Sequence, residues 1–427
     1  METNALIAIV VFLATYVFII SEKIHRTVIA LVGGMTVVVL GIISQETAIH
    51  HIDFNTLGLL VGMMIIVGVT AETGLFNYLA IKAAKKVEGR PTQVMLVMSI
   101  LTAVCSALLD NVTTVLLTVP VTISIAKKLE VPATPFLVSQ ILASNIGGTA
   151  TLIGDPPNIM IGSSTELGFG DFALNLAPIS IVILIVTVIL LELIYKKRLV
   201  TTDDLRAHIM TLDENKELKD MALLKKSVTM LTITIVLFGL HQILHLESAT
   251  VAMFCASVLL LIAYPSHEKQ LEAVFKKVEW VAIFFFVGLF VLVGSLVETG
   301  VISMIAQEAM EVTKGDTAST AILILWLSAI ASAFVDNIPF VATMIPMIHE
   351  MGRMGMENLT ALWWSLALGA CLGGNGTLIG ASANVVVAGI AAAAGHPISF
   401  VRFFKIAFPL MILSIIISHV YVYFRYL

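Results

Sequence analysis

Charged residues are scarce in this sequence: Asp, Glu, Lys and Arg together make up 12% of the 427 residues. A soluble domain carries about 25% of them, so this scarcity excludes an ordinary soluble globular fold. Cysteine is also rare, and Cys105, Cys255 and Cys371 form no CxxC or metal-ligand pattern. We interpret them as small apolar packing residues. The formal net charge of −5 gives no indication of nucleic-acid binding.

Apolar residues make up 58% of the chain, and the mean hydropathy is +1.00. A membrane-spanning helix needs about 20 apolar residues. The first apolar stretch lacks a basic n-region and a small-residue cleavage site, so we expect a retained helix rather than a signal peptide. The apolar stretches predict membrane segments near residues 5–22, 27–44, 55–72, 133–165, 175–195, 229–246, 249–264, 278–297, 359–392 and 406–424.

Two further apolar stretches, about 92–126 and 318–348, each carry an Asp-Asn pair near the middle. Each pattern predicts a re-entrant helical hairpin that leaves the membrane on the side it entered. The stretches at about 133–165 and 359–392 exceed one span and contain glycine-rich polar runs, so we expect broken transmembrane helices there.

The distribution of basic residues tests this arrangement, because cytoplasmic loops hold most Lys and Arg. With the N-terminus outside, the 24 Lys and Arg residues divide into 21 inside and 3 outside, namely Lys314, Arg353 and Arg425. Treating either hairpin as a single crossing would spoil this division. The only sizeable polar segment, 196–228, is then expected to be a cytoplasmic linker.

An internal repeat relates the two parts of the chain at a constant offset of 226 residues (336 − 110, 380 − 154, 384 − 158). The windows 61–74, 106–120 and 147–158 contain 20 identities in 41 positions when they are compared with their counterparts. The shared positions are mainly polar residues and glycines. We therefore predict an all-α polytopic membrane protein with two inverted-topology repeats, 1–195 and 229–427, each with one hairpin and one broken helix.

The hairpin tips and broken helices are the candidate binding elements. Irregular backbone inside a membrane is tolerated only where protein buries it or where it lines an aqueous cavity. Unwound carbonyls coordinate cations, and the N-termini of half-helices attract anions. The candidate ion- or substrate-binding residues are Asp110, Asn111, Thr113, Thr114, Asn145, Gly148, Thr149, Thr151, Gly154, Asp155, Asn158, Asp336, Asn337, Gly374, Asn375, Thr377, Gly380, Ser382 and Asn384.

Three acids in these motifs allow two interpretations each. Asp110 and Asp336 could cap the second arm of their hairpins, and Asp155 could be a turn residue before Pro156. Alternatively, ionisable residues inside a membrane are functional candidates. Asp155 has no acidic counterpart, because position 381 is Ala. No Lys or Arg lies within the motifs, so the acids favour a cation, Na⁺ or a proton.

These motifs resemble the ion transporter superfamily, and within it the ArsB/NhaD permease family and bacterial relatives of the melanosomal P protein. The segments that carry the resemblance are 109–114, 145–148, 153–158, 278–280, 336–346 and 369–384. The resemblance implies a homodimer in the plasma membrane, with a scaffold and a mobile transport domain that moves as an elevator. Related sodium-coupled carboxylate carriers have Ser-Asn-Thr hairpin tips, whereas this chain has Asp110-Asn111-Val112 and Asp336-Asn337-Ile338.

The expected function is ion-coupled secondary transport, either Na⁺/H⁺ antiport or transport of an inorganic or organic anion. Arsenite, antimonite, citrate or a dicarboxylate are alternative cargoes. We expect no cofactor beyond Na⁺ or a proton as coupling ion, no structural metal, and Na⁺ ligation at Asn111, Gly154, Asn337 and Gly380. The expected partners are a small ion or small anionic substrate and the lipid bilayer, not nucleic acid. An intramembrane aspartyl protease using Asp110 and Asp336, or a channel, are the rival classes.

Overall fold

The structure is a computed structural model that describes residues 3–21, 23–265 and 268–427. Within these ranges it contains helices and no strand. Eight of the helices are long and apolar enough to cross a membrane. The predicted all-α polytopic membrane fold is therefore confirmed.

The helices that form the fold have the following bounds. They are α1 (Thr3–Ser21), α2 (Arg26–Val39), α3 (Gln45–His51), α4 (Phe54–Glu72), α5 (Leu75–Lys86), α6 (Pro91–Leu108), α7 (Asn111–Lys128), α8 (Thr134–Thr149), α9 (Pro156–Ser164), α10 (Phe169–Tyr195), α11 (Asp203–Met210), α12 (Met221–Leu240), α13 (Ser248–Ala263), α14 (Glu268–Phe275), α15 (Trp280–Glu298), α16 (Val301–Thr313), α17 (Thr317–Phe334), α18 (Asn337–Arg353), α19 (Leu359–Gly373), α20 (Ser382–Ala393) and α21 (Phe400–Tyr426), with short 3₁₀ turns η1 (Glu214–Glu217) and η2 (Gly374–Gly376).

One group of helices, which we call the outer layer, consists of α1 to α4 and α12 to α15. Within it α2 packs along α15, and α13 packs along α4. Both crossings are close because small residues meet there: a Cβ atom on Gly34 would lie 2.6 Å from the Gly288 carbonyl oxygen. A Cβ atom on Gly62 would lie 2.7 Å from the backbone of Ala252. Such small-residue contacts are typical of helix pairs in membranes.

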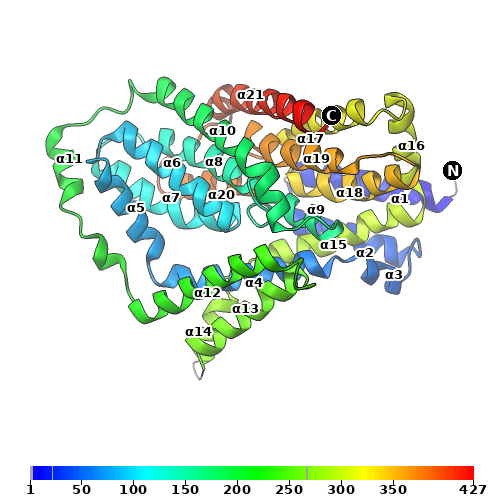
Figure 1. The fold of residues 1–427 in the computed structure, drawn as a ribbon, viewed down its shortest axis with the longest axis horizontal. Coiled ribbons are helices and arrows are strands. Elements are labelled where there is room, and N and C mark those ends of the chain that lie inside the picture. The colour runs from blue at the N-terminus through cyan, green and yellow to red at the C-terminus, as the bar shows by residue number, and fades with distance from the viewer. Residues whose placement is uncertain (1–2, 22, 266–267) are drawn as a thin grey trace.

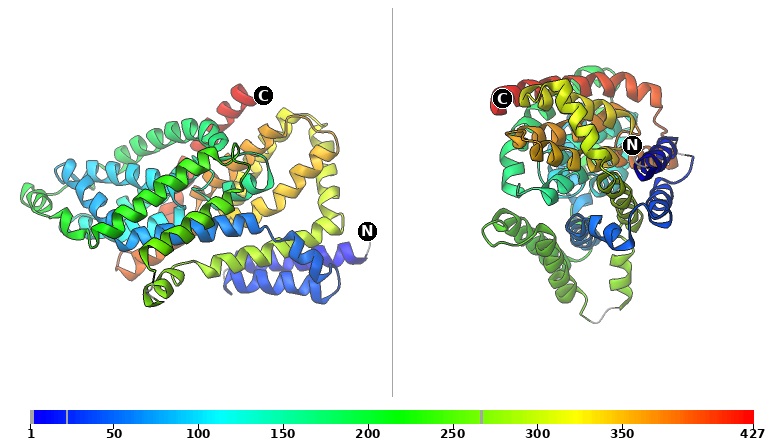
Figure 2. Two further views of the ribbon diagram at one scale, coloured as in Figure 1. Left: turned by 60° about the horizontal axis from the view of Figure 1, so that its bottom comes forward. Right: turned by 90° about the vertical axis from the view of Figure 1, so that its right-hand side faces the viewer.

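The second group, the hairpin bundle, consists of α6 to α10 and α17 to α21. Helices α6 and α7 form one hairpin and α17 and α18 the other, while α8–α9 and α19–η2–α20 are the two broken helices. Helix α10 packs on α8, and α21 packs on α19. The left panel of Figure 2 shows the outer-layer helices α4, α13, α15, α1 and α2 below this bundle.

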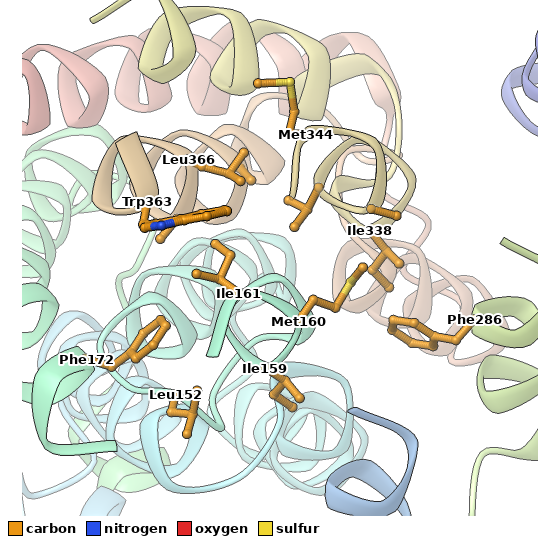
Figure 3. Packing of buried hydrophobic residues seen from close by; sticks show 14 of the residues in the cluster. Leu152, Ile159, Met160, Ile161, Phe172, Phe286, Ile338, Met344, Trp363 and Leu366 are labelled. Carbon is orange, nitrogen blue, oxygen red and sulfur yellow. The ribbon is translucent and has the colours of Figure 1, made fainter. Parts of the chain in front are cut away.

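A continuous apolar core joins the two groups. Met160 and Ile161 of α9 are buried, and so are Ile338 of α18, Phe286 of α15 and Trp363 of α19. Figure 3 shows Met160 pointing toward Ile338 and Phe286. The first broken helix therefore packs against the second hairpin and against the outer layer in the same cluster.

The chain termini and the segment that contains α11 lie at opposite ends of the molecule. Figure 1 shows the N- and C-terminal ends at one end of the molecule and α11 at the other. The segment expected as a linker, 196–228, contains α11 and η1, and α12 begins within it at Met221.

Two amphipathic helices, α5 and α16, had no place among the predicted segments. Each follows a glycine in the left-handed region, Gly74 with φ of 81° and Gly300 with φ of 73°. These glycines end α4 and α15 at residues 226 apart, so the repeated Glu-Thr-Gly sequence has the same local structure in both places.

Candidate functional site

The two hairpin tips are single breaks in which the helical backbone becomes extended. Leu109 and Asp110 separate α6 from α7, and Val335 and Asp336 separate α17 from α18. Asp110 Oδ1 accepts a hydrogen bond of 2.8 Å from the Thr113 amide, and Asp336 Oδ1 accepts one of 3.2 Å from the Ile338 amide. Both aspartates therefore cap the second arm of their hairpin, as N-cap carboxylates do.

The broken helices are interrupted where pairs of glycines bring two backbone segments together. A Cβ atom on Gly148 would lie 2.6 Å from the Gly154 carbonyl oxygen, and one on Gly380 would lie 2.7 Å from that of Gly374. No side chain larger than hydrogen fits these approaches without a shift of the backbone. The glycine runs thus let each broken helix turn tightly before its second half begins.

Two asparagine side chains satisfy the carbonyl groups that each break exposes. Asn158 Nδ2 donates to the carbonyl oxygens of Thr149 (3.1 Å) and Thr151 (2.8 Å). Asn384 Nδ2 donates to the carbonyl oxygens of Gly374 (2.7 Å) and Thr377 (2.8 Å). Both asparagines are fully buried, so these bonds replace the helical bonds that the chain loses at the break.

Each broken helix is tied to the hairpin of its own repeat by hydroxyl groups. Thr151 Oγ1 donates to the Ala107 carbonyl oxygen and Thr377 Oγ1 to that of Ala333, both at 2.5 Å. The matching bonds from Ser106 and Ser332 reach carbonyl oxygens of α8 and α19 at 2.6 Å. The predicted ligands Thr151 and Thr377 therefore donate their protons to hairpin backbone.

At the first hairpin tip, four side-chain amides form a buried network that we call the asparagine cluster (Asn111, Asn145, Asn375 and Asn384). Asn111 Nδ2 donates to Asn145 Oδ1 at 3.2 Å. Asn145 Nδ2 in turn donates to Asn375 Oδ1 and Asn384 Oδ1, both at 2.9 Å. The cluster joins residues of both repeats, so the two broken helices meet through Asn145.

At the second hairpin tip the asparagine meets an ionisable residue instead of another amide. Asn337 Nδ2 donates to Asp155 Oδ1 at 3.2 Å, and Cys371 Sγ lies 3.5 Å from Asn158 Oδ1. Asp155 is only 1% exposed, and its Oδ2 atom is buried without a hydrogen-bond partner among the described residues. We call Asp155, Asn337, Asn158 and Cys371 the Asp155 cluster.

A basic residue from outside the motifs reaches the second hairpin tip. Arg26, at the start of α2, forms an ion pair with Asp336 Oδ2, and its second guanidinium nitrogen donates to Ser382 Oγ at 2.8 Å. Ser382 Oγ also donates to Asp336 Oδ2 at 2.8 Å. Sequence reasoning missed Arg26, because it placed this residue in a loop and found no basic residue within the motifs.

The structure brings the other predicted residues to the same region. Thr113, Thr114 and Thr149 lie on α7 and α8 beside the asparagine cluster, and the Thr114 hydroxyl is buried without a partner among the residues that the structure describes. Gly148, Gly154, Gly374 and Gly380 form the close approaches described above. Cys371, interpreted from sequence as a packing residue, belongs to the Asp155 cluster and contacts polar groups as well as apolar side chains.

Comparisons with known proteins agree with this architecture. Residues 16–369 match the model of the CitMHS family, described as citrate transporters. The chain belongs to the citrate transporter family. This family consists of transporters, so the alternative of an intramembrane aspartyl protease is set aside.

Relatives of this transporter span nearly its whole length. It is 42% identical to "Uncharacterized transporter Rv2684" of Mycobacterium tuberculosis, over 99% of both chains. It is 33% identical to the human P protein, with 98% of this chain matched to 60% of the longer protein. The resemblance to the P protein is thereby confirmed.

Among solved structures, the YdaH transporter of Alcanivorax borkumensis has a similar fold. The TM-score is 0.60 over 99% of this chain and 98% of the other, with 13% sequence identity. At this identity the match concerns the fold alone. Together with the apolar helices, these comparisons identify a multi-pass membrane transporter for which the plasma membrane is a suitable location.

Proposed function

We propose that this protein is an ion-coupled secondary active transporter in which Asp155 binds the coupling cation, Na⁺ or a proton. The observation that carries the proposal is the buried, unpartnered Oδ2 atom of Asp155 beside unwound backbone. A buried carboxylate is stable only when it is neutralised by a proton, a metal ion or a fixed positive charge. The described residues near Asp155 offer amide and thiol groups instead of a fixed positive charge.

The proposed cargo is a small anion, with citrate as the first candidate because the family is described by that substrate. The half-helices α9 and α20 both begin at the breaks, so their N-termini supply positive dipole ends for an anion. Arsenite, antimonite, a dicarboxylate and Na⁺/H⁺ antiport remain the alternative cargoes and reactions.

For the transport cycle we propose elevator movement of the hairpin bundle against the outer layer, within a homodimer. In support, both hairpins, both broken helices and both clusters belong to the bundle, so the site can move as one unit. The outer layer contributes close helix pairs, such as α2 with α15, that suit a static support.

A flux screen in proteoliposomes tests the proposed function. We expect uptake of one of citrate, arsenite or a dicarboxylate against its gradient, or Na⁺/H⁺ exchange, driven by an inward Na⁺ or proton gradient. Asp155→Asn keeps the size and removes the charge, so this variant should lose the cation dependence of flux. Normal flux with an unchanged pH and Na⁺ profile in Asp155→Asn would contradict the proposal, since Asn serves a turn equally well.

A further inference from the structure

The contact between Arg26 and the second hairpin tip connects the two groups of helices. Arg26 belongs to α2 of the outer layer, whereas Asp336 and Ser382 belong to α18 and α20 of the hairpin bundle. The guanidinium also stacks on an outer-layer ring, with its Cζ atom 5.1 Å from the centroid of Phe285. Arg26 is thus anchored on the outer layer, and its guanidinium nitrogens bind Asp336 and Ser382 of the hairpin bundle.

The ion pair is only partly exposed to water. The Asp336 side chain is 7% exposed and the Arg26 side chain is 31% exposed. Removing one partner from such a pair leaves an uncompensated charge, which is far more unfavourable than the loss of a surface salt bridge. Movement of the bundle away from Arg26 therefore leaves the Asp336 carboxylate without its counter-charge unless another cation replaces Arg26.

A cavity gives solutes access to the pair. It has a volume of about 350 Å³, and its lining includes Arg26, Asp336, Ser382, His25 and Glu279. Its acidic groups are Asp336 and Glu279, and its basic groups are Arg26 and His25; Asp155 lies next, across Asn337. A small cation that enters the cavity can therefore reach Asp336.

The first hairpin tip has no comparable contact among the described residues. Asp110 accepts a bond from the Thr113 amide, and no ion pair to Asp110 is formed by the part of the chain that the structure describes. In the second repeat α13 packs on α4 as α2 packs on α15, and its first residue, Ser248, is not basic. Among the described residues, the ion pair thus joins the outer layer to the second hairpin tip and not to the first.

We propose that Arg26 is a gate residue that holds the bundle against the outer layer while Asp336 is ionised, and that Na⁺ or a proton at Asp336 releases it. Arg26 acts through Asp336 and is therefore a positioning residue. This inference rests on the proposed function and extends it. The contact keeps the bundle in place until a coupling cation binds to Asp336. Movement of the bundle is thereby coupled to cation binding.

Labelling of a reporter cysteine measures whether the bundle occupies this position. Val385 of α20 lines the cavity and is 47% exposed, and the three native cysteines are buried. In proteoliposomes, Val385→Cys should react rapidly with an impermeant maleimide on the cavity side when Na⁺ is absent and the pH is high. Saturating Na⁺ at constant pH should slow this reaction roughly tenfold as the population shifts. A lower pH should slow it by more than the fall in the thiolate fraction alone.

Variants of the pair separate the gate from a merely structural contact. In the reporter background, Arg26→Gln and Asp336→Asn should both slow labelling roughly tenfold without added cation. The response to Na⁺ should disappear, and the pH response should fall to that of the thiolate fraction alone. The double variant should be no slower than either single one, because both remove one interaction. Arg26→Lys keeps the charge and should restore the cation response.

The matched control is Arg425→Gln. Arg425 also stacks on an aromatic ring, 5.5 Å from the Tyr421 centroid, and donates to Asn175, but these contacts lie within the bundle. In the reporter background, Arg425→Gln should react with the maleimide at the same rate as the parent and respond to Na⁺ in the same way. Cation-driven counter-gradient flux together with parent-like labelling in Arg26→Gln would overturn the gate alone. A labelling response without any counter-gradient flux in the parent would overturn the proposed function instead.

Discussion

At the scale of single residues, the two clusters differ in charge although the repeats place them at matching hairpin tips. Asn111 meets Asn145 at one tip, and Asn337 meets Asp155 at the other. The asparagine cluster is neutral, and its members satisfy one another. In the Asp155 cluster, Asp155 Oδ2 has no hydrogen-bond partner among the described residues. This asymmetry supports the proposal that the coupling cation binds at the second tip.

Replacing Asn111 with Ala tests the asparagine cluster. The variant removes the donor to Asn145 Oδ1, which then remains buried without this partner. We expect destabilisation of about 1–3 kcal/mol and loss of transport, because the broken helices meet through Asn145. Thermal unfolding of the purified protein and flux in proteoliposomes measure the two effects.

The control for this variant is Asn77→Ala, which removes a side-chain amide that donates to Glu217 at 3.0 Å away from the hairpin tips. It should transport normally. Wild-type flux in both Asn111→Ala and Asn337→Ala would show that the tips do not bind the ion or the substrate.

At the scale of helices and hairpins, the sequence predicts most of the site. The Asp-Asn pairs in the middle of apolar runs locate both hairpin tips, and the glycine runs locate both breaks. These signals are local, since capping and close backbone approach depend on residues a few positions apart. Arg26 and Asp336 lie 310 positions apart, and no local pattern reports that folding brings them together.

Gly147→Ala tests how closely a broken helix must approach its hairpin. A Cβ atom at Gly147 would lie 2.2 Å from the Ala103 carbonyl oxygen of α6. Helices α6 and α8 would have to separate, so we expect destabilisation of about 1–3 kcal/mol from overpacking and a large loss of flux. Differential scanning calorimetry of the detergent-solubilised protein measures the loss of stability.

Gly389→Ala is the matched control for Gly147→Ala. Gly389 lies inside α20, and nothing lies within 4 Å of the position of its added Cβ atom. Alanine is favoured over glycine in a helix by roughly 0.5–1 kcal/mol, so this variant should be as stable as the parent or more so. Equal stability of the two variants would show that the close approach at Gly147 is not required.

At the scale of the whole molecule, the chain ends and the linker helix α11 lie apart, as expected if the termini and the linker face opposite sides of the membrane. Both termini lie at one end of the molecule, and α11 lies at the other (Figure 1). Glu72 pairs with Lys277 and Glu298 with His51. These repeated glutamates end α4 and α15.

The last prediction concerns this orientation in the membrane. We expect the termini outside and residues 196–228 inside, because 21 of the 24 basic residues then lie on the cytoplasmic side, as the positive-inside rule requires. Lys216 lies in the linker and Lys314 follows α16, and both are exposed. With buried native cysteines, Lys314→Cys should react with an impermeant maleimide on intact cells, and Lys216→Cys only after permeabilisation. The opposite pattern, or labelling of a cysteine at Ser164 only from inside, would reverse the topology. It would also place the cavity beside Arg26 on the outer side, so the same experiment decides from which side the coupling cation reaches Asp336.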